Sequence, residues 1–292
     1  MGLSIGTTYE GKNFGYLKGI LPFVQHIEIS PDSLAYKKNN EVAIRPDAMN
    51  ELIWMQEQSD ADLLIHGITL SIGSYDGYSQ DYIRLLEQLF DNLKIRWHSE
   101  HLAYTTVNGE ALGTMLTLPR TDEAIDLVCG RIDTIQKKFK VPFLLENVIS
   151  MLPMPGHRYS HAAFLNKITN LTGCGLILDI YNMECDAHNF GLNIPCFLDE
   201  LDLNNVYELH VASGQIDPEY NFMMDIHAGL VADSTFELTR EVIKRTPKNL
   251  QAITFEILDE FIEKLSASDI TDELIKIDWL VNKTHEPASF AN

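Results

Sequence analysis

PFLLEN, residues 142–147, contains a short apolar run of strand-forming residues that leads directly to an ionisable side chain, Glu146. Similar runs recur along the chain, and longer segments with a helical period separate them. Eight strands are expected, at residues 3–8, 26–30, 63–72, 96–104, 142–148, 175–180, 207–213 and 252–258. Buried strands that alternate with amphipathic helices predict a parallel sheet, and eight such units favour closure into a (β/α)8 TIM barrel.

The helices expected between these strands cover residues 46–58, 78–93, 121–139, 160–171 and 234–245. TDE at 121–123 and STFE at 234–237 are typical of capped helix starts. Residues 259–279 read as a closing helix before a polar tail from about residue 283. The alternative fold, an open doubly wound sheet, lacks a G-x-G-x-x-G turn after an early strand. We therefore expect one α/β domain, a TIM barrel over residues 1–292.

The composition argues against several classes of protein. Lys and Arg number 22 against 42 Asp and Glu, which gives a net charge of −20 and leaves no basic cluster for nucleic acid. We find no secretory signal pattern in MGLSIGTTYEGKNF and no apolar run near the roughly 20 residues that span a membrane. The four cysteines show no C-x-x-C spacing. A cytoplasmic protein with reduced thiols is expected.

Ionisable side chains stand where barrel strands should be apolar. Burying one such group alone costs several kcal/mol, and the C-terminal ends of barrel strands meet at one mouth. Any single histidine of the set could equally be a hydrogen-bonded core residue, but their joint occurrence predicts shared metal binding. Imidazole with carboxylate suits Fe, Mn or Zn better than Ca or Mg. The strand-end residues are His66, His101, Glu146, Asp179, His210 and Glu256.

Two further segments enlarge this set. Asn182 places an amide three residues after Asp179, and Asp225 precedes His227 by two residues. Residues two apart face the same way in an extended segment, so Asp225 and His227 could reach one ion.

These residues carry a resemblance to a known family. The segments HGITLSIGS, SEHLAY, LLENVIS, LILDIYNMECDAHNFG, ELHVASG and DIHAGLV are similar, in order and spacing, to the multinuclear non-heme iron-dependent oxidative enzymes, the methanobactin-biosynthesis-B-like family. The similarity runs from about Gly2 to Glu256. More distantly, the chain resembles endonuclease IV and xylose-isomerase-like barrels, in which a histidine stands at the position of Asn182.

The resemblance implies a distribution of ligands among two or three iron ions of mixed valence. His66 and His101 would hold the first ion, and Glu146 would bridge it to the second. The other ligands of the second ion would be Asp179, His210 and Glu256, and those of a third, weaker site Asn182, Asp225 and His227.

Neighbouring residues would orient these ligands or approach the substrate. Ser99, Glu100 and Asn147 flank ligands and are expected to orient them. His188, in DAHNFG, is the candidate catalytic residue outside the ligand set.

The resemblance also implies an activity. Such enzymes use O2 as co-substrate to oxidise cysteine residues of ribosomally made peptides, and a partner protein often recognises the leader of the precursor peptide. This chain departs from the family pattern at residues 212–215, 228–231 and 257–260, which leaves the ligands intact and bears on the choice of peptide.

Two other classes of function fit a metal-containing barrel. One is a metal-dependent phosphodiesterase or sugar isomerase, against which stand the acidic charge and the lack of a convincing lysine beside the ligand set. The other is a non-catalytic, metal-containing protein that only binds a peptide. Consumption of O2 with a thiol peptide separates these classes.

Overall fold

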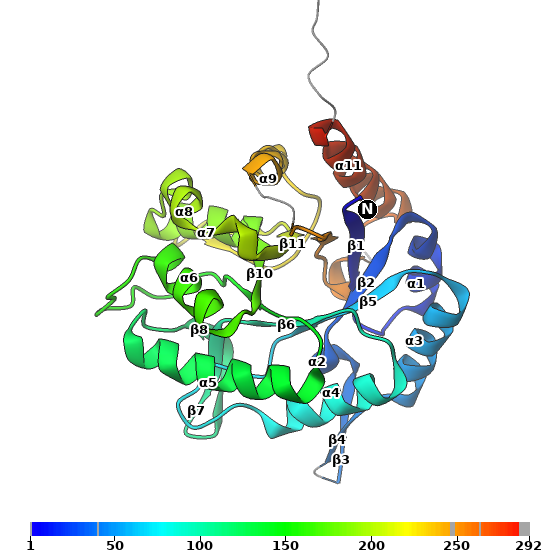
Figure 1. The fold of residues 1–292 in the computed structure, drawn as a ribbon. Coiled ribbons are helices and arrows are strands. Elements are labelled where there is room, and N and C mark those ends of the chain that lie inside the picture. Colours follow the sequence, from blue (N-terminus) through cyan, green and yellow to red (C-terminus); the bar gives the residue numbers. More distant parts are fainter. Residues whose placement is uncertain (1, 40, 246–248, 263, 286–292) are drawn as a thin grey trace, which may run out of the picture.

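The barrel predicted from the sequence is confirmed. The computed structural model describes residues 2–39, 41–245, 249–262 and 264–285, and within them eight parallel strands close into a barrel around which helices form an outer ring (Figure 1). β1 pairs with both β2 and β14, which closes the sheet. The barrel strands are β1 (Ser4–Tyr9), β2 (His26–Ile29), β5 (Asp62–Gly67), β6 (His98–His101), β9 (Phe143–Glu146), β10 (Gly175–Asp179), β11 (Val206–Val211) and β14 (Ala252–Phe255).

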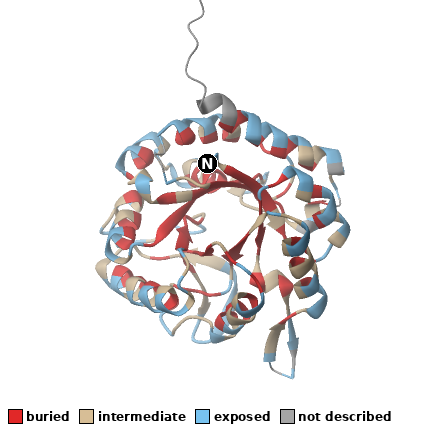
Figure 2. Cartoon of the chain, turned by 45° about the vertical axis from the view of Figure 1, so that its right-hand side comes forward, coloured by how far each residue is buried: buried red, intermediate tan, exposed pale blue. Residues whose placement is uncertain are grey.

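The helices cover the outside of the barrel. In Figure 2 their buried residues face the strands and their exposed residues face outward. The principal helices are α1 (Phe14–Ile20), α3 (Pro46–Gln58), α4 (Gln80–Asn92), α5 (Asp122–Phe139), α6 (His161–Thr172), α7 (Ile180–Phe190), α8 (Ile194–Glu200), α9 (Asp233–Arg245) and α11 (Ala267–His285). Short helical turns are α2 (Pro31–Leu34), η1 (Leu21–Phe23), η2 (Leu203–Asn205) and α10 (Asp259–Ile262). Thr121 caps α5 as predicted, because its side chain accepts a hydrogen bond from the amide of Ala124.

Two expected strands and the closing helix differ from the prediction. The strand expected at 63–72 ends at Gly67, because side chains of other segments bind the next amides: Asp32 accepts from the amide of Ile68, and Glu100 from that of Leu70. The strand expected at 96–104 divides into β6 and a hairpin strand. The closing helix expected at 259–279 is interrupted between α10 and α11, and the polar tail from residue 286 lies outside the described residues.

Three antiparallel hairpins, absent from the prediction, follow barrel strands. They are β3 (Ala35–Lys38) with β4 (Glu41–Ile44), β7 (Ala103–Val107) with β8 (Glu110–Thr117), and β12 (Gln215–Asp217) with β13 (Phe222–Met224). Each lies in a connection after the C-terminal end of a barrel strand, which is the end where active sites of TIM barrels are built.

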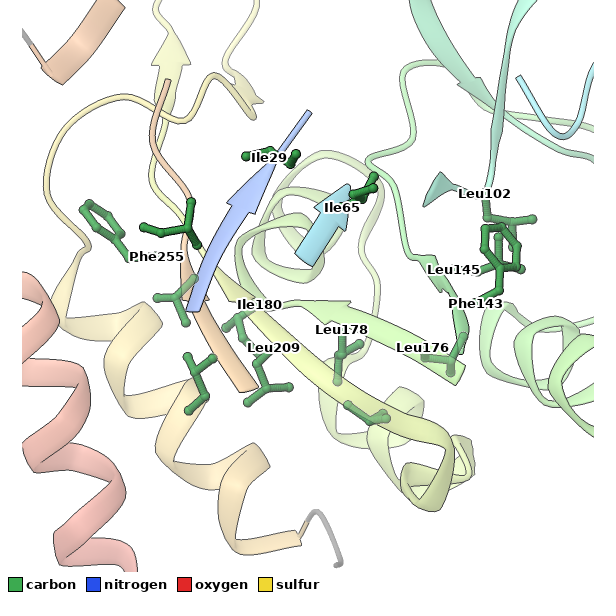
Figure 3. Close-up of a cluster of buried hydrophobic side chains, with 14 of the residues drawn as sticks. Ile29, Ile65, Leu102, Phe143, Leu145, Leu176, Leu178, Ile180, Leu209 and Phe255 are labelled. Carbon is green, nitrogen blue, oxygen red and sulfur yellow. The ribbon is translucent and has the colours of Figure 1, made fainter. Parts of the chain in front are cut away.

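The core divides into two layers that position the site. Side chains such as Ile65, Phe143 and Phe255 belong to the large apolar cluster between strands and helices (Figure 3). The alternate face of the strands points into the barrel. There a small cluster fills the lower interior, formed by Leu64, Trp97, Leu144, Ile177 and Ala252. The same inward face carries polar side chains two residues further along the strands, such as His66, Glu146 and Asp179. In the described residues, no helix is long and apolar enough to span a membrane.

Candidate metal centre

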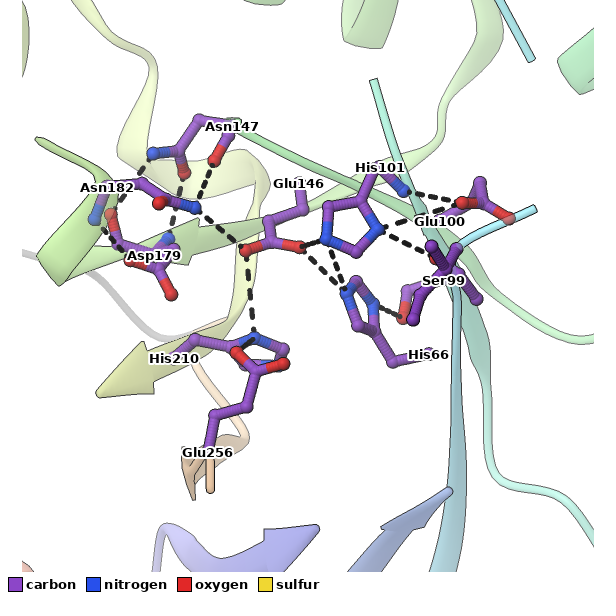
Figure 4. A network of polar contacts seen from close by, with 12 residues as sticks. His66, Ser99, Glu100, His101, Glu146, Asn147, Asp179, Asn182, His210 and Glu256 are labelled. Carbon is purple, nitrogen blue, oxygen red and sulfur yellow. Dashed lines mark hydrogen bonds and ion pairs between the residues drawn. The ribbon is translucent and has the colours of Figure 1, made fainter. Parts of the chain in front are cut away.

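The strand-end residues meet at one end of the barrel because neighbouring strands are in register there. His101 of β6 stands level with Glu146 of β9, and Asp179 of β10 stands level with His210 of β11. Figure 4 shows their side chains converging from different strands. All six predicted strand-end residues are buried. The structure therefore brings together side chains that lie up to 190 positions apart in the sequence (66 to 256).

The first group consists of His66, His101 and Glu146. One oxygen of Glu146, Oε2, lies 2.8 Å from Nε2 of His66 and 3.2 Å from Nε2 of His101. The other ring nitrogen of each histidine is already engaged: Nδ1 of His66 lies 2.9 Å from the Ser99 hydroxyl, and Nδ1 of His101 lies 2.8 Å from the carbonyl of Gly67. Both Nε2 atoms are thus presented to the same point, as in metal sites whose histidines are oriented by a second hydrogen bond.

The second group shares Glu146 with the first. Ligand atoms of Glu146, Asp179, His210 and Glu256 all lie within 4.8 Å of one another. Nδ1 of His210 lies 3.1 Å from Glu256 Oε2 and 3.8 Å from Glu146 Oε1. The two oxygens of Glu146 therefore face two different groups, which is the arrangement that a bridging carboxylate requires.

The residues expected in the third site fall into two places. The Asn182 amide donates to Glu146 Oε1 at 3.3 Å, whereas His227 contacts Asp225 at 2.8 Å and Glu256 at 3.2 Å. No hydrogen bond joins Asn182 to Asp225 or His227 in the described part of the chain. The segment around His227 is also not extended as expected, because His227 has a φ of 49°. Asp225 and His227 nevertheless meet directly.

Of the residues expected to orient ligands, Ser99 contacts the ring of His66, whereas Asn147 and Glu100 bond the backbone of a predicted ligand. The Asn147 side chain bonds both the amide and the carbonyl of Asp179, at 2.8 and 3.1 Å. Glu100 accepts a hydrogen bond from the amide of His101 at 3.1 Å. His188, by contrast, is exposed on the last turn of α7, where its ring bonds the carbonyl of Asn221 at 3.0 Å. The structure does not bring His188 to the cluster, and its approach to a substrate stays a prediction.

Two buried glutamates were missed in the sequence. Glu28 of β2 and Glu208 of β11 lie beneath His210, with carboxylate oxygens 3.1 and 3.7 Å from its Nε2. The prediction from the sequence does not include them, because they stand inside strands rather than at strand ends. Glu208 precedes His210 by two residues, so strand alternation alone places both on the inward face.

The charges of the cluster shift its pKa values strongly. Burial by itself would lower the pKa of His101, but the carboxylates of Glu146 and Glu100 raise it to about 10. Burial would raise the pKa of Glu146, but His101 and His66 lower it to about 2. Burial, followed by repulsion from Glu146, raises the pKa of Asp179 well above its usual range. The carboxylates thus require positive charge close by, which either protonated imidazoles or metal ions can provide.

Two buried oxygens indicate where an ion fits. Oδ2 of Asp179 and Oδ1 of Asn182 have no hydrogen-bond partner among the described residues, although both atoms are buried. An unsatisfied buried polar atom costs about 1–3 kcal/mol, so these oxygens fit a cation better than a packing role. Nitrogen and oxygen ligands together fit iron, manganese or zinc.

The cluster opens onto a cavity, and a surface groove adjoins that cavity. The cavity has a volume of about 190 Å³ and is lined by His66, His101 and the third-site residues Asp225 and His227, among others. The neighbouring groove has a volume of about 710 Å³ and runs between residues 68–79 and the β7–β8 hairpin. Ile68 and Met115 line both spaces. The cluster therefore lines a cavity that lies beside a larger surface groove.

Comparison with known proteins gives matches over most of the chain. The family model described as "RiPP precursor modification enzyme MbnB/TglH/ChrH" matches residues 4–278. A "UPF0276 protein" of Caulobacter vibrioides (strain NA1000 / CB15N) is 32% identical over 182 residues, which cover 62% of this chain and 65% of the relative. The chain thus spans less than two thirds of the length of that relative. A "UPF0276 protein" of Anaeromyxobacter sp. (strain Fw109-5) is 28% identical over 223 residues, covering 76% of this chain and 78% of the relative.

Solved structures give the same fold at low identity. The IOLI protein with a bound zinc atom has a TM-score of 0.62 and 15% identity, covering 98% of this chain and 100% of the other. A xylose isomerase domain containing protein from Salmonella typhimurium LT2 has a TM-score of 0.59 and 11% identity, covering 96% and 99%. At this identity the similarity shows a xylose-isomerase-like barrel and carries no information on substrate.

Proposed function

Because the chain belongs to the RiPP precursor modification enzyme family MbnB/TglH/ChrH, we propose that it oxidises a cysteine residue of a ribosomally made precursor peptide with O2 and two or three iron ions of mixed valence. The single observation that carries this proposal is the position of Glu146. Its two oxygens face two separate groups of imidazole and carboxylate ligands. A pair of adjacent ions held in this way suits a reaction in which a substrate and O2 are activated side by side.

The proposed ligands follow the geometry of the two groups. His66, His101 and Glu146 would hold one ion, and Glu146 with Asp179, His210 and Glu256 would hold the other. Iron in these groups would supply Lewis acidity toward a thiolate and electrons for the reduction of O2.

A third ion is proposed beside the second group. His227 contacts both Asp225 and Glu256, and the buried side-chain oxygen of Asn182 has no hydrogen-bond partner among the described residues. Asn182 offers only a neutral oxygen, so this ion would be held most weakly.

The cavity supports a peptide substrate. The 190 Å³ space at the cluster accommodates one small side chain, and the 710 Å³ groove that adjoins it accommodates flanking residues of an extended segment. On β8, Ala111 and Gly113 line the groove and leave it open, because their side chains are small or absent. A leader-recognising partner protein would add affinity at a distance from the cluster.

The lining also weighs against the alternative functions. None of the described residues that line the cavity or the groove is Lys or Arg. A phosphodiester would find no cationic side chain there, and a sugar isomerase no lysine beside the ligands. A phosphodiesterase or isomerase activity is therefore disfavoured.

The test uses a short cysteine-containing precursor peptide, with and without a candidate leader-recognising partner protein. Iron-loaded protein in air should change the mass of the peptide and consume O2. The same peptide with Ser in place of Cys, the same mixture without O2, and zinc-loaded protein should give no change. Reaction of the Ser peptide or turnover without O2 would exclude thiol oxidation. Peptide binding without any mass change would favour a non-catalytic metal-containing protein.

A further inference from the structure

His210 stands between two layers of carboxylates inside the barrel. Its Nδ1 faces the cluster, 3.1 Å from Glu256 Oε2, and its Nε2 faces the lower interior, 3.1 Å from Glu28 Oε1 and 3.7 Å from Glu208 Oε1. The ring is fully buried. Only one of its nitrogens can therefore bind an ion of the cluster, while the other carries the ring proton.

The two lower glutamates differ in their other contacts. Glu208 is held by two donors: Trp97 Nε1 lies 2.9 Å from its Oε2, and the Thr254 hydroxyl donates to its Oε1. Glu28 is 1% exposed, and among the described residues no group donates a hydrogen bond to either of its oxygens. In the part of the chain that the structure describes, its one ion-pair contact is Nε2 of His210 at 3.1 Å, and that nitrogen likewise has no other hydrogen-bond partner there. The carboxylate of Glu28 thus has both oxygens free for the proton on that nitrogen.

We propose that Glu28 is a positioning residue of the metal centre: it accepts the Nε2–H of His210 and so fixes the tautomer and ring angle that present Nδ1 to an ion. This proposal rests on the proposed function only for the presence of metal in the upper cluster. It acts through His210, as carboxylates that accept from metal-bound histidines do in other sites. Glu208 is already bound by Trp97 and Thr254 and so lies in a fixed position beside Glu28 and His210.

The test compares Glu28→Gln with Glu28→Leu, because the Gln side chain keeps an acceptor oxygen and the Leu side chain does not. The matched control is Glu273→Gln, which changes another fully buried glutamate, on α11, that contacts Lys276 and the amide of Val231. The probe is Fe(II) alone, added without O2, with binding followed by competition with a chelator. A second readout is the ¹⁵N spectrum of histidine-labelled, zinc-loaded protein, which reports the nitrogen that carries the proton.

We expect Fe(II) to bind Glu28→Leu about 10- to 100-fold more weakly than wild type, and Glu28→Gln to recover most of that loss. In the wild type the His210 signals should show a proton on Nε2 and metal on Nδ1, and this pattern should be lost in Glu28→Leu alone. The Glu273→Gln variant should match the wild type in both readouts.

Three results would overturn the proposal. One is unchanged affinity and unchanged ¹⁵N pattern in Glu28→Leu. Another is the loss of one whole ion with no effect on the affinity of the rest, which would make Glu28 a ligand. A third is a wild-type protein that takes up no metal. Failure of the proposed function is distinct: Glu28→Leu would still weaken Fe(II) binding while the cysteine peptide remained unoxidised by the wild type.

Discussion

Replacing Glu146 by Gln removes the one carboxylate that both ligand groups share, while the size of the side chain stays the same. In the metal-free protein, Glu146 compensates the histidines of the first group at 2.8 and 3.2 Å. Its pKa is lowered from the ordinary value of 4.5 to about 2, which corresponds to about 3 kcal/mol of stabilisation at neutral pH. Loss of one partner of a buried pair typically costs about 3–5 kcal/mol, in agreement with this value.

The expected loss depends on pH in a defined direction. A carboxylate whose pKa is lowered on folding stabilises the protein above its unfolded pKa, and this contribution is lost as the pH falls through its folded pKa. The difference between the wild type and Glu146→Gln should therefore be complete at pH 7 and should shrink below about pH 4.5 toward pH 2. At pH 7 it should lower the Tm of metal-free protein by roughly 5–10 °C.

The assay is thermal unfolding of chelator-treated protein at several pH values, with elemental analysis of the same variants after reconstitution with iron. Glu146→Gln should lose metal from both groups at once. A Tm within about 1 °C of the wild type at pH 7 would refute the electrostatic argument. Full iron content in Glu146→Gln would refute the bridging role.

Three further outcomes are expected. Metal affinity should rise about tenfold or more per pH unit between pH 6 and 8. Neighbouring carboxylates raise the pKa of His101 to about 10 and that of His210 well above its usual value despite burial, and these protons must leave before an ion binds. A pH-independent affinity in chelator competition would contradict this. Asn182→Ala should reduce the iron content by the third ion only, as measured by elemental analysis, and equal loss in Glu146→Gln would argue against separate sites. Ala111→Trp, which fills the groove, should raise the KM for the peptide about tenfold or more. Leu112→Trp, on the opposite face of the same strand, should leave that KM nearly unchanged. Equal effects of the two substitutions would show that the peptide does not use the groove.

The barrel could be predicted from the sequence because its signal is local and repeated. Most barrel strands lie in an apolar run that ends at an ionisable residue, although β6, with the sequence HSEH, is polar throughout. The hairpins could not be predicted in this way. Residues 103–117 form a hairpin in which β7 is mostly half-buried and β8 mostly exposed, and β6 is followed by it after Leu102 alone. Sequence periodicity therefore predicts one strand where the structure has β6 and β7.

The candidate site was predicted in part for a similar reason. His66, His101, Glu146, Asp179, His210 and Glu256 are recognisable because they end strands, and the register of parallel strands then brings them level. Glu28 and Glu208 lie inside strands, where the position of an ionisable residue alone does not indicate a site. The division of the third-site residues between Glu146 and Glu256 depends on side-chain directions at the start of α7 and at the positive φ of His227. Neither can be read from spacing.

The two hairpins that flank the mouth are joined to ligands by very short pieces of backbone. β7 begins at Ala103, two residues after His101, and β13 ends at Met224, directly before Asp225. Each hairpin is therefore connected to a predicted ligand by at most one intervening residue. If a peptide binds against either hairpin, as proposed, any shift of that hairpin would also shift the adjacent His101 or Asp225 side chain, so that peptide binding and the geometry of the candidate centre would be coupled.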